Sequence, residues 1–240
     1  MKDFAKWENT RNGTILALIT TLLYIPSAIY FFKYSKPHSI IHLEQSNIST
    51  DKFLIGYIFI IFVVILISSI FGFAWAKKYG AKGFGSLYDI FYGLKYILIG
   101  GVFSGIVYYL LYTKRLYNIA PDTFPDKVSP VVIIIISNSI FEEVLFRFGI
   151  FSWWLRVIPK KFPPNQGLNM ALITSVISCT IISINQIYFS QGKIISEMLI
   201  NLIIANLIFN LIQHIIYIKY GLVSSILSHI ISYLRILLLF

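Results

Sequence analysis

The sequence has few charged residues. Asp, Glu, Lys and Arg make up 12% of its 240 residues, whereas a soluble globular domain carries about 25%. So few charges cannot cover the surface of a soluble fold. No polar stretch is long enough to bury a core of its own. These shortages exclude a soluble protein and a sizeable aqueous domain attached to a membrane anchor.

Cysteine and acidic residues are also scarce. The single cysteine, Cys179, excludes an internal disulfide. Ten acidic residues stand against twenty basic ones, which gives a net charge of +10. The basic residues are spread over short loops and form no stripe. We therefore expect membrane lipid as a partner and no nucleic acid.

Long apolar runs are what the sequence has in place of charge. Hydrophobic residues make up 57% of the chain, and the mean hydropathy is +0.77. A transmembrane helix needs about 20 predominantly apolar residues. We predict an all-α polytopic membrane protein with about seven transmembrane helices, at 14–32, 53–75, 88–112, 130–154, 168–189, 194–218 and 221–240. The first run is longer than the core of a signal peptide, so we interpret it as a span.

The loops carry a small charge asymmetry. Ten Lys and Arg residues lie on the side of the N-terminus and seven on the other, which favours a cytoplasmic N-terminus. The Ile-, Asn- and Lys-rich composition is typical of an AT-rich bacterial genome. We therefore expect a bacterial cell-membrane protein.

The fourth predicted span contains three charged residues. A run of β-branched residues, 131–136, leads into Glu142, Glu143 and Arg147. Insertion scales assign each mid-helix charge about 2.5–3.5 kcal/mol, so three charges cost about 8–10 kcal/mol. That cost is close to all that the apolar residues supply. We therefore expect the three side chains to be paired and to face a polar cavity.

Helical spacing separates the two glutamates. Glu143 and Arg147 are i,i+4 neighbours in the favourable order, so they fit a packing pair and a functional pair equally. Glu142 points about 100° away, where it has room for another partner. Because intramembrane ionisable residues mark functional sites, Glu142 is a candidate for acid–base catalysis.

Polar residues recur in the last three spans. They are Asn185 and Gln186 in the fifth, Asn206, Asn210 and His214 on one face of the sixth, and His229 and Tyr233 in the seventh. Each alone is more typical of a helix-to-helix hydrogen bond. Together they predict one polar cavity formed by the last four spans. Arg235 and Lys95 are interpreted as side chains that snorkel to the membrane surface.

The polar residues also divide the chain. We predict a single transmembrane domain, 1–240, in which 1–112 is scaffold and 113–240 is the motif-bearing core. Gly100, Gly101 and Gly105 in the third span predict a close approach to another helix.

The fourth and seventh spans resemble a known family. Glu142–Glu143–Val144–Leu145–Phe146–Arg147 is similar to the first motif of the CPBP family, the CAAX-processing and bacteriocin-processing intramembrane proteases, also called Abi proteins. Residues 219–229, a basic–Gly turn followed by a helix with His229, resemble the family's last motif. The order and spacing agree, and the resemblance covers about residues 90–240.

The resemblance implies a conical cavity with an active site inside the membrane. Carried over, Glu142 activates a water for attack on a peptide carbonyl. It acts alone or with a divalent metal such as Zn, bound by Glu142 and His229. Glu143 and Arg147 are the supporting pair, and His229 binds the water or metal or stabilises the oxyanion.

Two positions depart from the family's pattern. The middle motif is Phe-x-x-x-His, and the best alignment, 181–185, puts Asn185 at the His position. The last motif is His-x-x-x-Asn, and Tyr233 stands at the Asn position. Asn185 takes up no proton at neutral pH and is a poor metal ligand. His214 on the next helix is a substitute for the missing histidine.

Three functions follow from these patterns. The first is an intramembrane endopeptidase that acts on a membrane-associated peptide or membrane protein. The second is a catalytically impaired relative that binds a peptide or partner, for example in bacteriocin self-immunity. The third is a transporter or channel, which is less favoured because the sequence shows no internal repeat.

Overall fold

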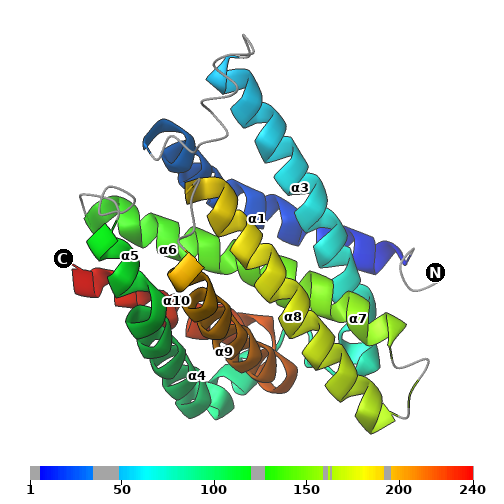
Figure 1. Cartoon of the computed structure of the whole chain (residues 1–240). Helices are drawn as coiled ribbons and strands as arrows, with labels where there is room; N and C mark the ends of the chain where they lie inside the picture. The colour runs from blue at the N-terminus through cyan, green and yellow to red at the C-terminus, as the bar shows by residue number, and fades with distance from the viewer. Residues whose placement is uncertain are drawn as a thin grey trace.

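The computed structural model describes residues 6–34, 49–119, 128–158, 162, 164–191 and 196–239. Across these ranges the chain forms helices and no strand, which confirms the predicted all-α fold class (Figure 1). The loops that the predicted spans leave between them, 33–52, 114–130 and 156–167, are described only in part, since residues 35–48, 120–127, 159–161 and 163 lie outside the described residues. The part of 114–130 that is described extends the neighbouring helices: α5 (Lys114–Ile119) is helical and α6 begins at Val128.

Seven helical stretches occupy the seven predicted spans in the described part of the chain. Four are single helices: α1 (Trp7–Tyr34), α3 (Thr50–Trp75), α8 (Pro164–Gln191) and α9 (Ser196–Tyr220). The other three are composite. The helix α4 (Leu87–Tyr108) continues through the π-helix η2 (Tyr109–Thr113) into α5. The helix α6 (Val128–Glu143) continues through the π-helix η4 (Val144–Phe151) into α7 (Ser152–Val157), and α10 (Leu222–Tyr233) ends in the 3₁₀-helix η5 (Leu234–Leu239). A short 3₁₀-helix, η1 (Lys77–Tyr79), follows α3.

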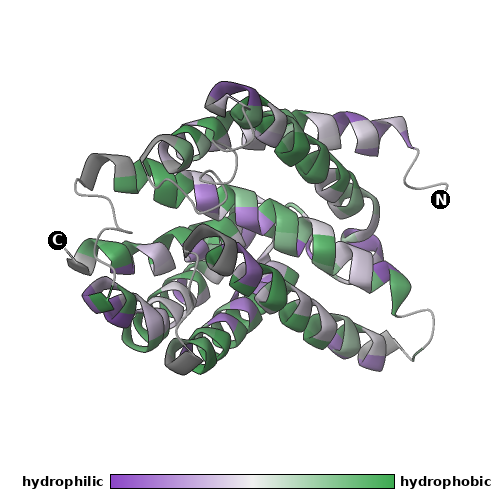
Figure 2. Cartoon of the chain, turned by 45° about the horizontal axis from the view of Figure 1, so that its top comes forward, coloured by the Kyte–Doolittle hydropathy of each residue, from purple (hydrophilic) through white to green (hydrophobic). Residues whose placement is uncertain are grey.

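Apolar side chains cover the outer surface of the helices. In Figure 2 green, hydrophobic residues recur along the helices of the bundle. Phe59 of α3, Phe91 of α4 and Ile181 of α8 are each more than half exposed. Five helices of the described chain are long and apolar enough to cross a membrane: Trp7–Tyr30, Asp51–Trp75, Leu87–Ile119, Gln166–Ile187 and Met198–Tyr220. The chain is therefore an integral membrane protein, because such a surface is compatible with lipid and not with water.

Two stretches are not among these five. The α6–η4 stretch carries Glu142, Glu143 and Arg147, and the apolar part of α10 is shorter, at Leu222–Leu237. Both lie against other helices of the bundle, since α10 contacts α4, α6 and α9, and η4 contacts α3 and α8. The stretches that carry the sequence motifs are thus enclosed by the apolar helices.

The glycines of α4 bring it close to α10, as predicted. A Cβ atom at Gly101 would lie 2.7 Å from the Ser228 carbonyl oxygen, and one at Gly105 would lie 2.9 Å from that of Ser232. Only the absence of a side chain permits this separation. The contact fixes α10, and with it His229, against α4.

A loop fixes the turn between α9 and α10. The backbone N–H of Leu222 donates to the Gly83 carbonyl at 2.9 Å, and that of Val223 donates to the Phe84 carbonyl at 3.3 Å. Gly221 has a φ of 88°, and a Cβ there would lie 2.6 Å from the Gly85 Cα. Only glycine fits this left-handed turn so close to another backbone. Both ends of α10 are therefore held by α4 or the loop that precedes it.

Candidate functional site

Four motif residues meet in the middle of the bundle. Glu142 and Glu143 end α6, Arg147 lies in the π-helix η4, and His229 lies in α10. His229 contacts both carboxylates, although 86 residues separate it from Glu143. The site therefore combines two stretches that are far apart in the sequence.

Glu143 is closed in on every side. Its side chain is fully buried. Oε1 lies 3.2 Å from Nη1 of Arg147 and 2.7 Å from Nδ1 of His229. Ser225 of α10 donates its hydroxyl to Oε2. A buried carboxylate with three partners is a structural anchor, because its lone pairs are already occupied.

Arg147 extends the anchor to the next two helices. It too is fully buried. Its Nη2 donates to Oδ1 of Asn210 in α9 at 2.9 Å, and the Asn210 amide donates to Oγ1 of Thr180 in α8 at 3.1 Å. The guanidinium carbon also lies 5.5 Å from the centre of the Phe209 ring. One network thus links α6, η4, α8, α9 and α10.

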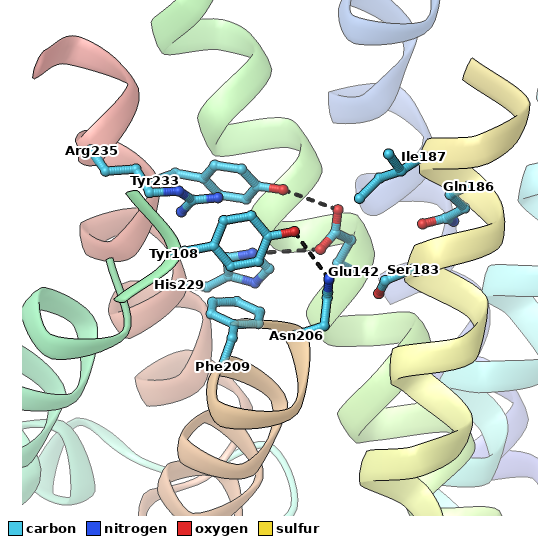
Figure 3. A pocket seen from close by; sticks show the side chains of 10 residues that line it. All are labelled: Tyr108, Glu142, Ser183, Gln186, Ile187, Asn206, Phe209, His229, Tyr233 and Arg235. Atoms are coloured by element: carbon cyan, nitrogen blue, oxygen red, sulfur yellow. Dashed lines mark hydrogen bonds and ion pairs between the residues drawn. The ribbon is translucent and has the colours of Figure 1, made fainter. Parts of the chain in front are cut away.

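Glu142 differs from its neighbour because it faces a cavity. Its side chain is 19% exposed. The Tyr233 hydroxyl donates to its Oε1 at 3.3 Å, and its Oε2 lies 3.5 Å from Nε2 of His229. The cavity has a volume of about 80 Å³, which is room for several water molecules. Its lining comprises Tyr108, Glu142, Ser183, Gln186, Ile187, Asn206, Phe209, His229, Tyr233 and Arg235 (Figure 3).

His229 contacts both the buried carboxylate of Glu143 and the carboxylate of Glu142, which faces the cavity. Glu143 is already an acceptor for Arg147 and Ser225, so Nδ1 of His229 donates to it. The imidazole is stacked on the Tyr233 ring, with centroids 4.9 Å apart, and meets Phe209 edge-on at 4.6 Å. These contacts fix the ring so that Nε2 faces Glu142 and the cavity.

The other predicted site residues fall into three groups. Asn206 and Tyr233 line the cavity, and Asn206 donates to the Tyr108 hydroxyl at 3.2 Å. Asn210 and His214 lie behind it: His214 contacts Ser175 Oγ at 2.8 Å and the Asn210 carbonyl at 2.7 Å. Asn185 is exposed and outside the lining, where Ser183 and Gln186 of the same helix stand instead.

Sequence reasoning missed five lining residues, Tyr108, Ser183, Ile187, Phe209 and Arg235. Tyr108 comes from the third predicted span, so the cavity is not formed by the last four spans alone. Arg235 does not snorkel to the surface: it is 8% exposed and lines the cavity. The rule that marks intramembrane charges as functional candidates would have flagged Arg235. No comparable signal marks Tyr108 among many tyrosines.

The donor set does not match a catalytic zinc site. Among the described residues no group of three or more His, Cys, Asp or Glu side chains is arranged to hold a metal ion. Glu142 and His229 supply two ligands, and catalytic zinc takes three from the protein. Glu143 does not complete the set because Arg147, His229 and Ser225 occupy its oxygens. The side chains of the cavity and a water are therefore the reacting groups that this site offers.

Comparison with known families supports the sequence-based resemblance. Residues 124–234 match the family model described as Type II CAAX prenyl endopeptidase Rce1-like. No curated protein and no solved structure matches the chain. The matched range includes both glutamates, Arg147, His229 and Tyr233, and it excludes α1, α3 and α4. Residues 124–234 are therefore similar to the Rce1-like CAAX proteases, which confirms the resemblance that the motifs of the fourth and seventh predicted spans carry.

Proposed function

We propose that the protein is an intramembrane endopeptidase that hydrolyses a peptide bond in a membrane-associated peptide. One observation carries the proposal: Glu142 faces a polar cavity with room for several waters inside an apolar bundle, beside a histidine that the neighbouring Glu143 orients. A carboxylate and an imidazole that converge on one space are the groups that general acid–base hydrolysis needs.

The reaction begins with a water that lies in the cavity within hydrogen-bonding reach of both Glu142 and His229. Glu142 takes one proton from the water as its oxygen attacks the peptide carbonyl. His229 accepts a hydrogen bond from the water through Nε2, because Nδ1 donates to Glu143. The C–N bond then breaks as the protonated Glu142 returns the proton to the leaving amine. Base and acid are the same carboxylate in turn.

The developing oxyanion needs hydrogen-bond donors. Tyr233 presents its hydroxyl beside Glu142, and the Asn206 amide lies in the same lining. A phenol is a donor, so Tyr233 supplies a hydrogen bond at the position where the family has Asn. Glu143 and Arg147 act through His229 and are positioning residues.

The proposal extends to the chain's organisation. The core, 113–240, holds the chemistry, and 1–112 supports it, with Tyr108 as a contribution from α4. The protein lies in a bacterial cell membrane with its N-terminus in the cytoplasm. Lipid and a membrane peptide or protein are its partners.

A binding protein without catalysis is the second candidate. It is favoured by two observations: the Tyr233 hydroxyl occupies an oxygen of Glu142, and Asn185 lies outside the cavity. In that case the cavity recognises a peptide or partner, as in self-immunity to a bacteriocin.

Peptide termini distinguish the two. Membrane and secreted peptides are compared by mass spectrometry in cells with the wild type, Glu142→Ala or no gene. The endopeptidase predicts termini that appear with the wild type and are missing from both others. Identical termini in all three, with a deletion phenotype that Glu142→Ala rescues, support the binding protein and contradict the protease.

A further inference from the structure

Arg235 is a buried cation that the proposed mechanism does not use. It is the second residue of the 3₁₀-helix η5 that follows α10, is 8% exposed and lines the same cavity as Glu142. Among the described residues no carboxylate forms an ion pair with it, whereas the other buried arginine, Arg147, is paired with Glu143. A cation buried without an anion is costly unless a ligand completes it.

The protein holds this guanidinium in a fixed plane. Its Nη1 donates to the Ser232 carbonyl at 2.7 Å and its Nε donates to Thr113 Oγ1 at 3.4 Å. The guanidinium carbon lies 4.3 Å from the centre of the Tyr108 ring and 4.6 Å from that of Tyr233. Two of the five N–H donors are thus directed to neutral protein oxygens. The charge itself is neutralised by neither contact.

One tyrosine, Tyr233, contacts both the Arg235 guanidinium and the Glu142 carboxylate. The ring of Tyr233 contacts the guanidinium, and its hydroxyl contacts Glu142 (Figure 3). The guanidinium therefore lies within roughly 10 Å of Glu142, which is about three residues of extended peptide. A carboxylate bound at Arg235 would leave a nearby peptide bond beside Glu142.

We propose that Arg235 binds the free α-carboxylate of the membrane peptide and so selects the C-terminal end of a chain for the cavity. A planar guanidinium matches a carboxylate, and two aromatic faces pre-organise it. This inference rests on the proposed function, since it names the part of the substrate that the same cavity recognises.

Binding of a matched peptide pair tests the anchor. The probe is a fluorescent prenylated peptide of the CAAX type with a free C-terminal carboxylate, together with its C-terminal amide. Glu142→Gln protein in neutral phosphatidylcholine nanodiscs prevents cleavage. We expect the acid to bind about tenfold to a hundredfold more tightly than the amide. We expect Glu142→Gln/Arg235→Gln to lose that preference and keep the amide affinity, and Arg235→Lys to keep part of it.

A second arginine provides the matched control. Arg156 of α7 lies over the Trp75 ring, 4.5 Å from its centre, and is not part of the cavity lining. Arg156→Gln in the Glu142→Gln background should keep the full preference for the acid. An acid preference that survives Arg235→Gln overturns the proposal, as does equal binding of acid and amide to the Glu142→Gln protein.

Two further readouts separate the anchor from its alternatives. If Arg235 served only to neutralise Glu142, Arg235→Gln would slow cleavage of acid and amide equally. If it bound a lipid phosphate, Arg235→Gln would reduce retention of phosphatidylglycerol in native mass spectrometry and leave peptide binding unchanged. Either result overturns the proposal. Carboxylate-dependent binding without any cleavage by the wild type would support the anchor and contradict the endopeptidase.

Discussion

His229 separates two carboxylates that are neighbours in the sequence and opposites in their surroundings. On one side Glu143 is fully buried with three partners. On the other side Glu142 is 19% exposed, has longer contacts of 3.3 and 3.5 Å, and opens on a cavity. The difference arises because successive residues of a helix point about 100° apart. One helix end thereby supplies both a fixed support and a reactive group.

Removal of the Glu142 charge should have the largest effect on activity. Glu142→Gln keeps the size of the side chain and removes the base, so we expect kcat/KM to fall by about 10²–10⁴-fold. The midpoint of thermal denaturation in detergent should stay close to that of the wild type, since the side chain has few contacts to lose. Full activity of this variant, measured on a peptide that the wild type cleaves, would contradict the assignment.

The equivalent change at Glu143 should act on stability. Glu143→Gln leaves Arg147 buried without its anion, so we expect a loss of about 3–5 kcal/mol in the free energy of unfolding. Resistance to SDS denaturation is the measurement. The control is Glu143→Gln/Arg147→Met, which removes both charges and should recover part of the loss. A Glu143→Gln protein as stable as the wild type would erase the contrast between the two glutamates.

Tyr233 should have a smaller effect, and its sign separates the two candidate functions. Tyr233→Phe removes one donor to the oxyanion, so we expect kcat to fall about tenfold, which corresponds to about 1.4 kcal/mol. Tyr233→Asn introduces the residue of the family and should retain more activity. An increase in kcat on Tyr233→Phe would mean that the hydroxyl blocks Glu142.

The smallest effects should distinguish two adjacent residues of α8. Gln186 lines the cavity and Asn185 does not. Gln186→Ala should raise KM about threefold, whereas Asn185→Ala should change neither stability nor kcat/KM by more than about 0.5 kcal/mol. Steady-state kinetics on the same peptide would measure both. A larger effect of Asn185→Ala would favour the alignment that places it at the family's histidine.

Much of the fold could be predicted because lipid imposes a simple rule. A span must be long and apolar, so the positions of seven helices followed from hydropathy. The close approach of α4 and α10 followed from Gly101 and Gly105, where side chains are missing. The π-helix of Val144–Phe151 could not be predicted, because hydropathy does not distinguish one helical hydrogen-bond pattern from another.

The site residues could be predicted where a charge in an apolar span raises the free energy of membrane insertion. Glu142, Glu143 and Arg147 are conspicuous in an apolar span, and the structure brings both glutamates to His229 and pairs Arg147 with Glu143. Asn185 and Gln186 are adjacent polar residues, so composition alone could not tell which faces the cavity. Arg235 was misread because a long cation near the end of a span usually reaches the surface, and here two tyrosine rings retain it inside.

The residues that pair with Glu143 and Arg147 are synthesised long after them, which affects the order in which the helices can enter the membrane. Asn210 is made 63 residues after Arg147, and His229 is made 86 residues after Glu143. At a synthesis rate of about 5–20 residues per second, the charges of α6 and η4 wait roughly 3 to 17 s for these partners. During that interval the α6–η4 stretch cannot be stable in lipid, because its charges lack these partners. It must be sheltered at the insertion machinery until α9 and α10 emerge, so the last helices to be made decide when the fourth can enter the membrane.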